Sequence, residues 1–311
     1  MLPPSGPLAV TVDSQVAGVH FVPDLDPAHV ARRLLAVNLS DLAAMGAEPA
    51  YALLALAAPE GFDHERFLRP FAAACERAGV TLAGGDLSRC DRLVASLTLI
   101  ATKPARGRWV RRSGARPGHD LWLGGTVGES AAGRLLIARG ARPVGPGEIG
   151  ERSRIDLGSS LSGPPPLLQA ARRAVRRHLS PSPQLDLGRW LGQQKAGAGM
   201  DVSDGVSRDL HRLCRESGTG AEIDAEALPL SDRFFDVCKA LSADPFDLAL
   251  GGGEDYVLLF TLPPGTRVPD SFGCRRIGTI TGGATITWMR DGRRRRLPDR
   301  GWDHLKRKSP G

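Results

Sequence analysis

The sequence predicts an α/β protein of two domains. At 311 residues the chain is too long for one ordinary hydrophobic core. Short β-branched, apolar runs alternate with longer segments of helical periodicity, which is the pattern of an α/β fold. The hydrophobic fraction of 41% is typical of a globular protein, and no stretch approaches the roughly 18 uninterrupted apolar residues that a membrane helix needs.

The first domain is predicted to cover residues 1–105. Asp26 followed by Pro27 is a typical helix start, and Gly46 closes the helical pattern that follows. Periodicity and β-branched runs predict four strands and a second helix in this domain. They are strands at Leu8–Val12, Tyr51–Ala58, Val80–Ala83 and Leu93–Lys103 and a helix at Glu65–Ala78.

The second domain is predicted to cover residues 106–311 and begins with a basic connector, RGRWVRRSGARPGHD. Glycine, proline and serine crowd residues 145–166, which predicts a loop there. The run Arg293–Arg296 follows a hairpin-like segment and is predicted to be a solvated edge strand. The other predicted elements are a strand at Leu121–Leu123, a helix in SAAGRLLIARG, a basic helix in LLQAARRAVRRHL, a strand in AGMDV, a helix to Glu216, and strands at Ala221–Ile223 and after the triple glycine of GGGEDYVLLFTLP.

Acidic residues recur where apolar runs end. They are Asp13, Asp86, Asp201 with Asp204, and Glu254 with Asp255. Singly each is weak evidence, because aspartate and glycine also dominate ordinary turns. If they converge, two carboxylates about 4 Å apart repel by roughly 4 kcal/mol at an effective dielectric constant near 20, so the group would require divalent cations. Oxygen ligands favour magnesium or manganese over zinc.

Asp41 differs from these acids because it lies on the apolar stripe of the first predicted helix. An ionised carboxylate there costs several kcal/mol unless it is paired or metal-bound. The position therefore predicts either a structural acid with a hydrogen-bond partner or a metal ligand.

Several classes of site are disfavoured. The sequence has no GxxxxGK[ST] motif, no strand-to-helix GxGxxG and no GxSxG. Glycine-rich turns at residues 84–85, 124–128 and 251–253 remain, where backbone amides could approach phosphate oxygens, although a tight turn is the commoner meaning. The five cysteines are scattered and form no CxxC pair, which predicts reduced core residues.

Neither the net charge nor the first residues of the sequence indicate a particular partner or a targeting signal. The net charge of +7 is spread along the chain and aromatic residues make up 5%, so we predict no nucleic-acid partner. The first residues carry neither a signal nor a transit pattern, and we expect a cytoplasmic protein with no membrane partner.

Six segments, taken together and in order, resemble the thiamine-monophosphate kinase family. They are VDSQVAGVHF, AVNLSDLAAMGAEP, LAGGD, RRSGARPGHD, DVSDGVSRDL and GGGEDYVLLFT, and they span nearly the whole chain. This family belongs to the superfamily of aminoimidazole-ribonucleotide synthetase and selenophosphate synthetase. The resemblance implies the two-domain fold of that superfamily, a homodimer formed through the N-terminal domain, and ATP bound without a Walker loop.

The resemblance also implies roles for individual residues. It assigns magnesium ions to Asp13, Asp41, Asp86, Asp201, Asp204 and Thr11. It assigns the nucleotide to Gly85, Asp86, Arg112 and Ser203, and thiamine monophosphate to His20, Glu254 and Trp302. For His20, a buried and hydrogen-bonded structural histidine remains the alternative.

The implied activity is phosphoryl transfer from ATP to thiamine monophosphate, which yields thiamine diphosphate. The attacking phosphate has a second pKa of about 6 and is largely a dianion at neutral pH, so no side chain is expected to act as a catalytic base. The carboxylates would hold the magnesium ions that neutralise and align the two polyanions.

The sequence departs from the family at two places. Val12 stands where the family usually has threonine, and the GDDAA-like segment that normally precedes Asp13 is absent, so we expect one magnesium ligand to be missing. Two alternatives therefore stay open. The chain could be another ATP-using enzyme of the superfamily, or a nucleotide-binding homologue with impaired turnover.

Overall fold

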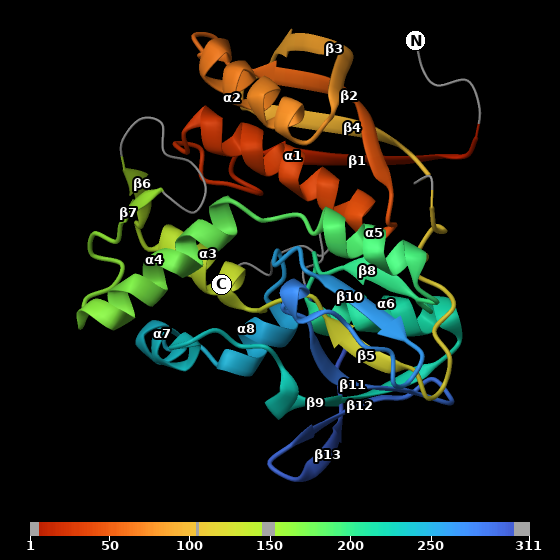
Figure 1. The fold of residues 1–311 in the computed structure, drawn as a ribbon. Coiled ribbons are helices and arrows are strands. Elements are labelled where there is room, and N and C mark those ends of the chain that lie inside the picture. Colours follow the sequence, from red (N-terminus) through yellow and green to blue (C-terminus); the bar gives the residue numbers. More distant parts are fainter. Residues whose placement is uncertain (1–5, 104–105, 145–152, 302–311) are drawn as a thin grey trace.

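A four-stranded sheet and two helices form the first part of the protein (Figure 1). The computed structural model describes residues 6–103, 106–144 and 153–301. The sheet has the strand order β1-β4-β2-β3, in which β4 is antiparallel to both neighbours and β2 runs parallel to β3. The elements are β1 (Leu8–Val16), α1 (Pro27–Ala44), β2 (Glu48–Ala58), α2 (His64–Arg77), β3 (Thr81–Arg89) and β4 (Val94–Thr102).

The first strand is longer than the sequence predicted. Asp13 was expected at the end of a strand, but β1 continues to Val16 because it pairs with β4 along its whole length. The alternation of the strand therefore decides where the side chains point. Thr11, Asp13 and Gln15 share the face that contacts α1, whereas Val10 and Val12 lie on the open face.

Helix α1 begins and ends at residues that the sequence singles out. The side chain of Asp26 caps the helix by accepting a hydrogen bond from the amide of Ala28 at 3.0 Å, and Pro27 occupies the first turn. Gly46 follows the helix at a φ of 63°, and a Cβ there would lie 2.7 Å from the carbonyl oxygen of Gly188. Glycine is thus needed both for the turn and for the close approach of α5.

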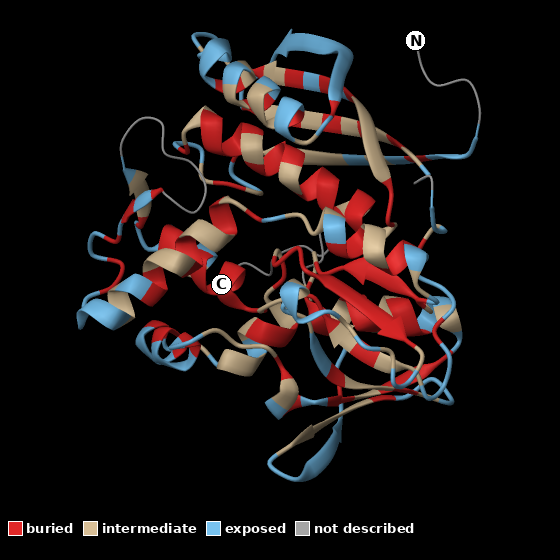
Figure 2. Cartoon of the chain, in the orientation of Figure 1, coloured by how far each residue is buried: buried red, intermediate tan, exposed pale blue. Residues whose placement is uncertain are grey.

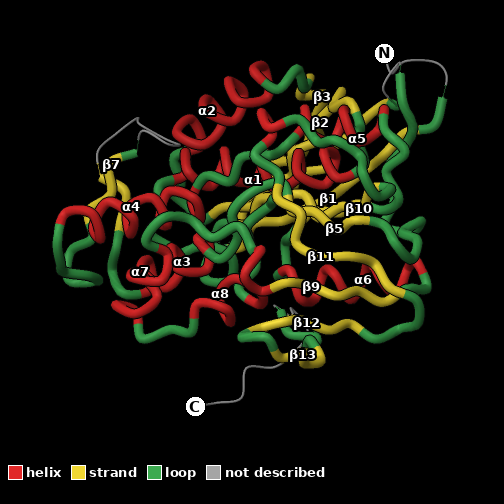
Figure 3. The backbone as a smooth tube through the Cα atoms, turned by 60° about the horizontal axis from the view of Figure 1, so that its bottom comes forward, coloured by secondary structure: helices red, strands yellow, loops and turns green. Residues whose placement is uncertain are grey.

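The second part of the protein contains a seven-stranded sheet in the order β13-β12-β9-β11-β5-β10-β8 (Figure 3). Its strands are β5 (Asp120–Leu123), β8 (Gly199–Asp201), β9 (Gly220–Asp224), β10 (Leu258–Leu262), β11 (Arg275–Thr281), β12 (Ile286–Arg290) and β13 (Arg293–Arg296). The helices are α3 (Glu129–Ala138), α4 (Pro165–Leu179), α5 (Leu185–Gln193), α6 (Val206–Ser217), α7 (Phe234–Leu241) and α8 (Pro245–Gly251), with short 3-10 turns η1 (Ala225–Ala227) and η2 (Asp270–Phe272).

Two features of the second part differ from the sequence-based expectation. The segment predicted as a loop contains strand β7 (Arg154–Asp156), which pairs with β6 (Arg142–Val144), and the first residues of α4. Strands of three residues are too short to show periodicity, so the pairing could not be read from the sequence. The short helices α5, α7 and α8 were missed for a similar reason. The arginine run does form an exposed edge strand, β13, as predicted.

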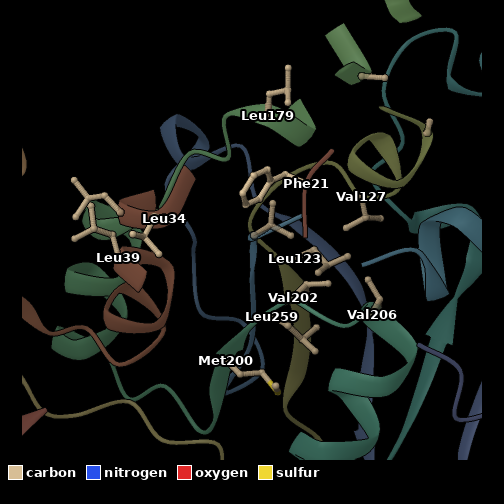
Figure 4. Packing of buried hydrophobic residues seen from close by; sticks show 14 of the residues in the cluster. Phe21, Leu34, Leu39, Leu123, Val127, Leu179, Met200, Val202, Val206 and Leu259 are labelled. Atoms are coloured by element: carbon tan, nitrogen blue, oxygen red, sulfur yellow. The ribbon is translucent and has the colours of Figure 1, made fainter. Parts of the chain in front are cut away.

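The larger of two buried hydrophobic clusters contains residues from both parts of the protein (Figure 2). Leu34 and Leu39 of α1 belong to the same buried cluster as Leu123, Val202 and Leu259 of the second part (Figure 4). Helix α1 contacts α5 and β8 as well as β1 and β4. It therefore forms a wall shared by the two parts, and residues on this helix can contribute to a site between them.

Candidate active site

A cavity of about 190 Å³ lies between β1 and α1 on one side and the second part of the protein on the other. Seven of the site residues predicted from the sequence line it. They are Asp13, His20, Asp41, Asp201, Ser203, Asp204 and Glu254. The structure thus brings together acids that are up to 241 residues apart in the chain, as Asp13 and Glu254 are.

The carboxylates of the cavity are held by hydrogen bonds from neighbouring elements. The hydroxyl of Thr11 donates to Asp41 at 2.5 Å, and the hydroxyl of Ser40 donates to Asp201 at 2.7 Å. The amide of Asp13 donates to the side chain of Asn38 at 3.1 Å, which fixes the strand against α1. Thr11, Asn38 and Ser40 therefore orient the acids without closing the cavity.

Mutual repulsion and burial shape the charge of this group. Burial, and next the carboxylate of Asp41, raises the pKa of Asp13 to about 6. The same two causes, in the same order, raise the pKa of Asp201 to about 8. Burial also raises the pKa of Asp41, although the hydrogen bond from Thr11 and the charge of Arg112 oppose this shift. A cation bound beside these carboxylates would lower their raised pKa values, because a nearby opposite charge favours the ionised form.

The donor set suits a hard cation that takes part of its coordination from a substrate. Within the described residues no three His, Cys, Asp or Glu side chains are arranged to hold an ion by themselves. Mg²⁺ is usually bound through one or two carboxylates, with waters and substrate phosphates as the other ligands. Oxygen atoms of Asp13, Asp41, Asp201 and Asp204 facing one cavity fit that requirement.

Asp204 is held by a second group of charges that sequence reasoning missed. Nη1 of Arg212 lies 2.6 Å from Asp204 and 2.9 Å from Asp209. Asp209 is buried, and its carboxylate accepts hydrogen bonds from the backbone amides of Ser203 and Asp204 at 3.1 and 3.0 Å. Asp209 thus fixes the turn that presents Ser203 and Asp204 to the cavity. Its place in the first turn of α6 was the available signal, since acids are favoured there.

A buried arginine, Arg33, holds the part of the cavity wall that contains Glu254. From α1 it donates to Gln15 at 3.2 Å, to the carbonyl oxygen of His178, and to Glu254 at 2.6 Å. Although burial opposes ionisation, the Arg33 guanidinium keeps the pKa of Glu254 below its ordinary value. Burial lowers the pKa of His178 to about 3, so this histidine is neutral where it meets Glu254.

The chain around Glu254 adopts an unusual backbone. Glu254 and Tyr256 have φ values of 60° and 51°, in the left-handed region that glycine favours. Such residues persist where surrounding contacts over-determine them, and they concentrate at functional sites. Here the Glu254 amide donates to the carbonyl of Ser203 at 2.7 Å and the Tyr256 amide donates to Val202 at 2.9 Å. These hydrogen bonds join the segment that carries Glu254 to the turn that carries Ser203 and Asp204, on the same side of the cavity.

Besides Thr11, three of the predicted site residues in the described part of the chain do not line the cavity. Gly85 and Asp86 lie on β3, the exposed edge strand farthest from β1. Asp13 pairs with Leu97, Leu97 with Leu54, and Leu54 with Gly85, so three strand spacings, about 14 Å, separate Asp13 from Gly85. Arg112 does not line the cavity, although its charge acts on Asp41. Trp302 lies outside the described residues.

His20 lines the cavity and also has a structural contact. Its Nδ1 accepts a hydrogen bond from the amide of Val16 at 3.0 Å. This bond closes the turn after β1 and leaves the rest of the ring beside the cavity. Both interpretations of His20 made from the sequence are therefore compatible with its position.

Comparisons with known proteins identify the family. A model of the family described as AIR synthase related protein, N-terminal domain, matches residues 1–102. The thiamine-monophosphate kinase of Salmonella typhimurium is 36% identical over an alignment that covers 98% of this chain and 88% of that protein. The chain belongs to the thiamine-monophosphate kinase family.

Solved structures of this family have the same fold. The structure of AaThiL complexed with AMPPCP and TMP has a TM-score of 0.80 at 31% identity, and covers 96% of this chain and 87% of that one. The thiamine-monophosphate kinase of Stenotrophomonas maltophilia has a TM-score of 0.76 at 32% identity, and covers 92% and 85%. The predicted fold, that of the AIR synthase superfamily, is thereby confirmed. In the described part of this family member, no helix is long and apolar enough to cross a bilayer.

Proposed function

We propose that this protein transfers the γ-phosphoryl group of ATP to thiamine monophosphate and so forms thiamine diphosphate. The observation that carries the proposal is the convergence of Asp13 and Asp41 with Asp201 and Asp204 on one cavity, beside His20 and Glu254. Membership of the thiamine-monophosphate kinase family supports the choice of acceptor, as does the likeness to AaThiL complexed with AMPPCP and TMP.

Magnesium is the metal that this donor set favours. Asp13, Asp41, Asp201 and Asp204 would hold it, with Thr11 as a further oxygen ligand or as the group that orients Asp41. Bound Mg²⁺ would neutralise the phosphate oxygens and the charge that develops on them during transfer. Ser203 and Arg112 would contact the nucleotide, Arg112 as a cation near Asp41.

The protein's own residues position the reactants and need not remove a proton. The acceptor phosphate is largely a dianion at neutral pH and can attack in line. His20 and Glu254 would bind the thiamine monophosphate side of the cavity, and Trp302 remains the proposed cover of the thiamine ring. The Arg33 ion pair keeps Glu254 ionised, as recognition of a cationic ring requires.

A homodimer through the open face of the first sheet is part of the proposal. Val10, Val12 and Leu53 are 62%, 64% and 41% exposed. Val12 and Leu53 both pair with Thr98 of β4, so they lie on the same face. A contiguous apolar sheet face of this kind typically marks a protein interface. Gly85 and Asp86 lie too far from Asp13 to share an ion with it in one subunit. We therefore propose that their nucleotide and metal role depends on the dimer or on a separate ion.

A coupled assay of ADP release tests the function. With ATP and magnesium, thiamine monophosphate should support turnover, whereas unphosphorylated thiamine should not, because it lacks the attacking phosphate. Excess chelator should abolish the activity. Equal turnover with another phosphorylated acceptor would favour a different enzyme of the superfamily, and nucleotide binding without turnover would favour the impaired homologue. We expect the enzyme to act in the cytoplasm.

A further inference from the structure

A second cavity, of about 500 Å³, lies in the second part of the protein and shares no lining residue with the acidic one. It is bounded by the glycine turn after β5, the start of α3, the last two turns of α4 and the segment before α5. The volume is in the range of small-molecule sites.

The wall formed by α4 is basic. Arg173, Arg176 and Arg177 have the spacing of one helical face, and all three line the cavity. The lining also includes one acid, Glu129, whose carboxylate accepts hydrogen bonds from Arg173 at 2.7 Å and Ser231 at 2.6 Å. Arg173 is therefore matched by Glu129, and the remaining positive charge belongs to Arg176 and Arg177.

Arg177 is the least satisfied of these side chains. Its Nε is buried and has no hydrogen-bond partner within the described parts of the chain. The charge of Arg177 does act on the buried carboxylate of Asp255, but both Asp255 oxygens already accept backbone amides, from Gly128 at 2.9 Å and Ser130 at 3.3 Å. A buried guanidinium nitrogen without a partner is costly, and an anion held by the guanidinium of Arg177, which lines the cavity, would offset part of that cost.

The glycine turn opposite offers two further donors. The amides of Gly124 and Val127 bond to the carbonyls of Leu258 and Pro229, whereas those of Gly125 and Thr126, between them, have no partner in the described structure. Consecutive free amides form an anion-binding concavity. A Cβ built on Gly125 would lie 4.0 Å from Nη2 of Arg177, so the guanidinium lies close to the turn that carries these amides.

We propose that this cavity binds the phosphate group of a small anion, either free phosphate or a phosphate monoester. Two backbone amides and the Arg177 guanidinium would donate to its oxygens from opposite sides, with the exposed hydroxyl of Ser182 at the rim. The site holds no cluster of carboxylates, so binding requires no magnesium. The proposal is independent of the kinase activity.

Calorimetry of the full chain in excess EDTA tests the proposal, because the acidic cavity repels phosphate when no metal is present. Inorganic phosphate and ribose 5-phosphate are titrated separately. We expect one site per chain for at least one probe, and the tighter of the two identifies the source of the phosphate group. Absence of binding by both probes would overturn the proposal.

Variants locate the binding site. Arg177→Gln should weaken binding about tenfold or more because it removes a charge-assisted donor. Arg172→Gln is the matched control, since Arg172 lies on the same helix, bonds to the carbonyl of Ile155 and does not line the cavity. Ser182→Glu, at an exposed position, tests the same site by repulsion if Arg177→Gln does not fold. Unchanged affinity in a folded Arg177→Gln or in Ser182→Glu would contradict the assignment.

Discussion

The guanidinium of Arg33 lies 2.6 Å from the carboxylate of Glu254, and this ion pair connects α1 to a segment 221 residues away in the chain. The side chain of Arg33 is 1% exposed. It thereby holds the acceptor wall of the acidic cavity against the helix that carries Asp41. The stability of the protein and the geometry of its site depend on the same contact.

Removing this buried cation should destabilise the protein strongly. Arg33→Met should lower the free energy of unfolding by about 3 kcal/mol, because Glu254 would lose the partner that offsets its desolvation. Arg89→Met is the control, since the Arg89–Glu60 pair is exposed and should contribute less than about 1 kcal/mol. Urea denaturation measures both values. Similar losses in the two variants would show that Arg33 is not a structural anchor.

Acids of the cavity should be required for turnover rather than for folding. Asp41→Asn and Asp204→Ala should each reduce kcat about a hundredfold or more, because a metal beside the phosphates would lose a ligand. The loss in Asp41→Asn should be partly recovered at high magnesium. Asp291→Asn, at an exposed turn, should behave as wild type. Near-normal kcat in the two cavity variants would refute the metal assignment.

The acceptor side should be separable from the nucleotide side. His20→Ala and Glu254→Gln should raise KM for thiamine monophosphate several-fold while the nucleotide affinity, measured by calorimetry, changes little. Glutamine is preferred to alanine at position 254 because it can still accept a hydrogen bond from Arg33. Equal losses of nucleotide affinity would assign both residues a structural role.

His178 should make the protein less stable in acid. Its pKa is about 3 in the folded state, below the ordinary value near 6.5, so the unfolded chain binds a proton that the folded protein excludes. This contribution is complete above the unfolded pKa and is lost as the pH falls, by up to about 1.4 kcal/mol per pH unit. Between pH 7 and pH 5, wild type should lose about 2 kcal/mol relative to His178→Gln. Parallel urea curves at each pH provide the comparison, and a constant difference would contradict the burial of a neutral ring.

The open face of the first sheet should control assembly. Val10→Glu should convert the proposed dimer to a monomer, because it would place a charge within an apolar interface. Val144→Glu replaces another exposed valine, on β6 in the second part of the protein, and should leave the mass unchanged. Sedimentation equilibrium measures the mass. A wild-type protein that is monomeric at micromolar concentration would exclude this interface.

The sequence predicted the acids of the site better than their supports. Asp201 and Asp204 follow an apolar run and belong to a recognisable motif, so local signals were sufficient. Arg33 and Asp209 lie inside helices, and their roles arise from contacts with distant or folded segments that no local pattern encodes. Short helices such as α5 escaped prediction for a different reason, since they are too short to show periodicity.

Strand order was the other information that local patterns lacked. Asp86 has a sequence context like that of the cavity acids, because it too comes at the end of an apolar run. The pairing of β3 with β2 alone puts it at the far edge of the sheet. Neither propensity nor periodicity shows whether a strand lies next to β1 in the sheet or at the opposite edge, three strand spacings away.

The four arginines of strand β13 affect how readily this protein would aggregate at high concentration. It ends the seven-stranded sheet with four exposed arginines, of which Arg294 pairs with Glu222. An unpaired strand edge is a template on which another chain can add a strand, the first step toward aggregation. Here an incoming copy would bring the same row of positive charges, and repulsion would oppose the alignment. With valine or threonine at these four positions, the same strand edge could pair with a strand of another copy. The positive charge of β13 therefore opposes fibril-like self-association.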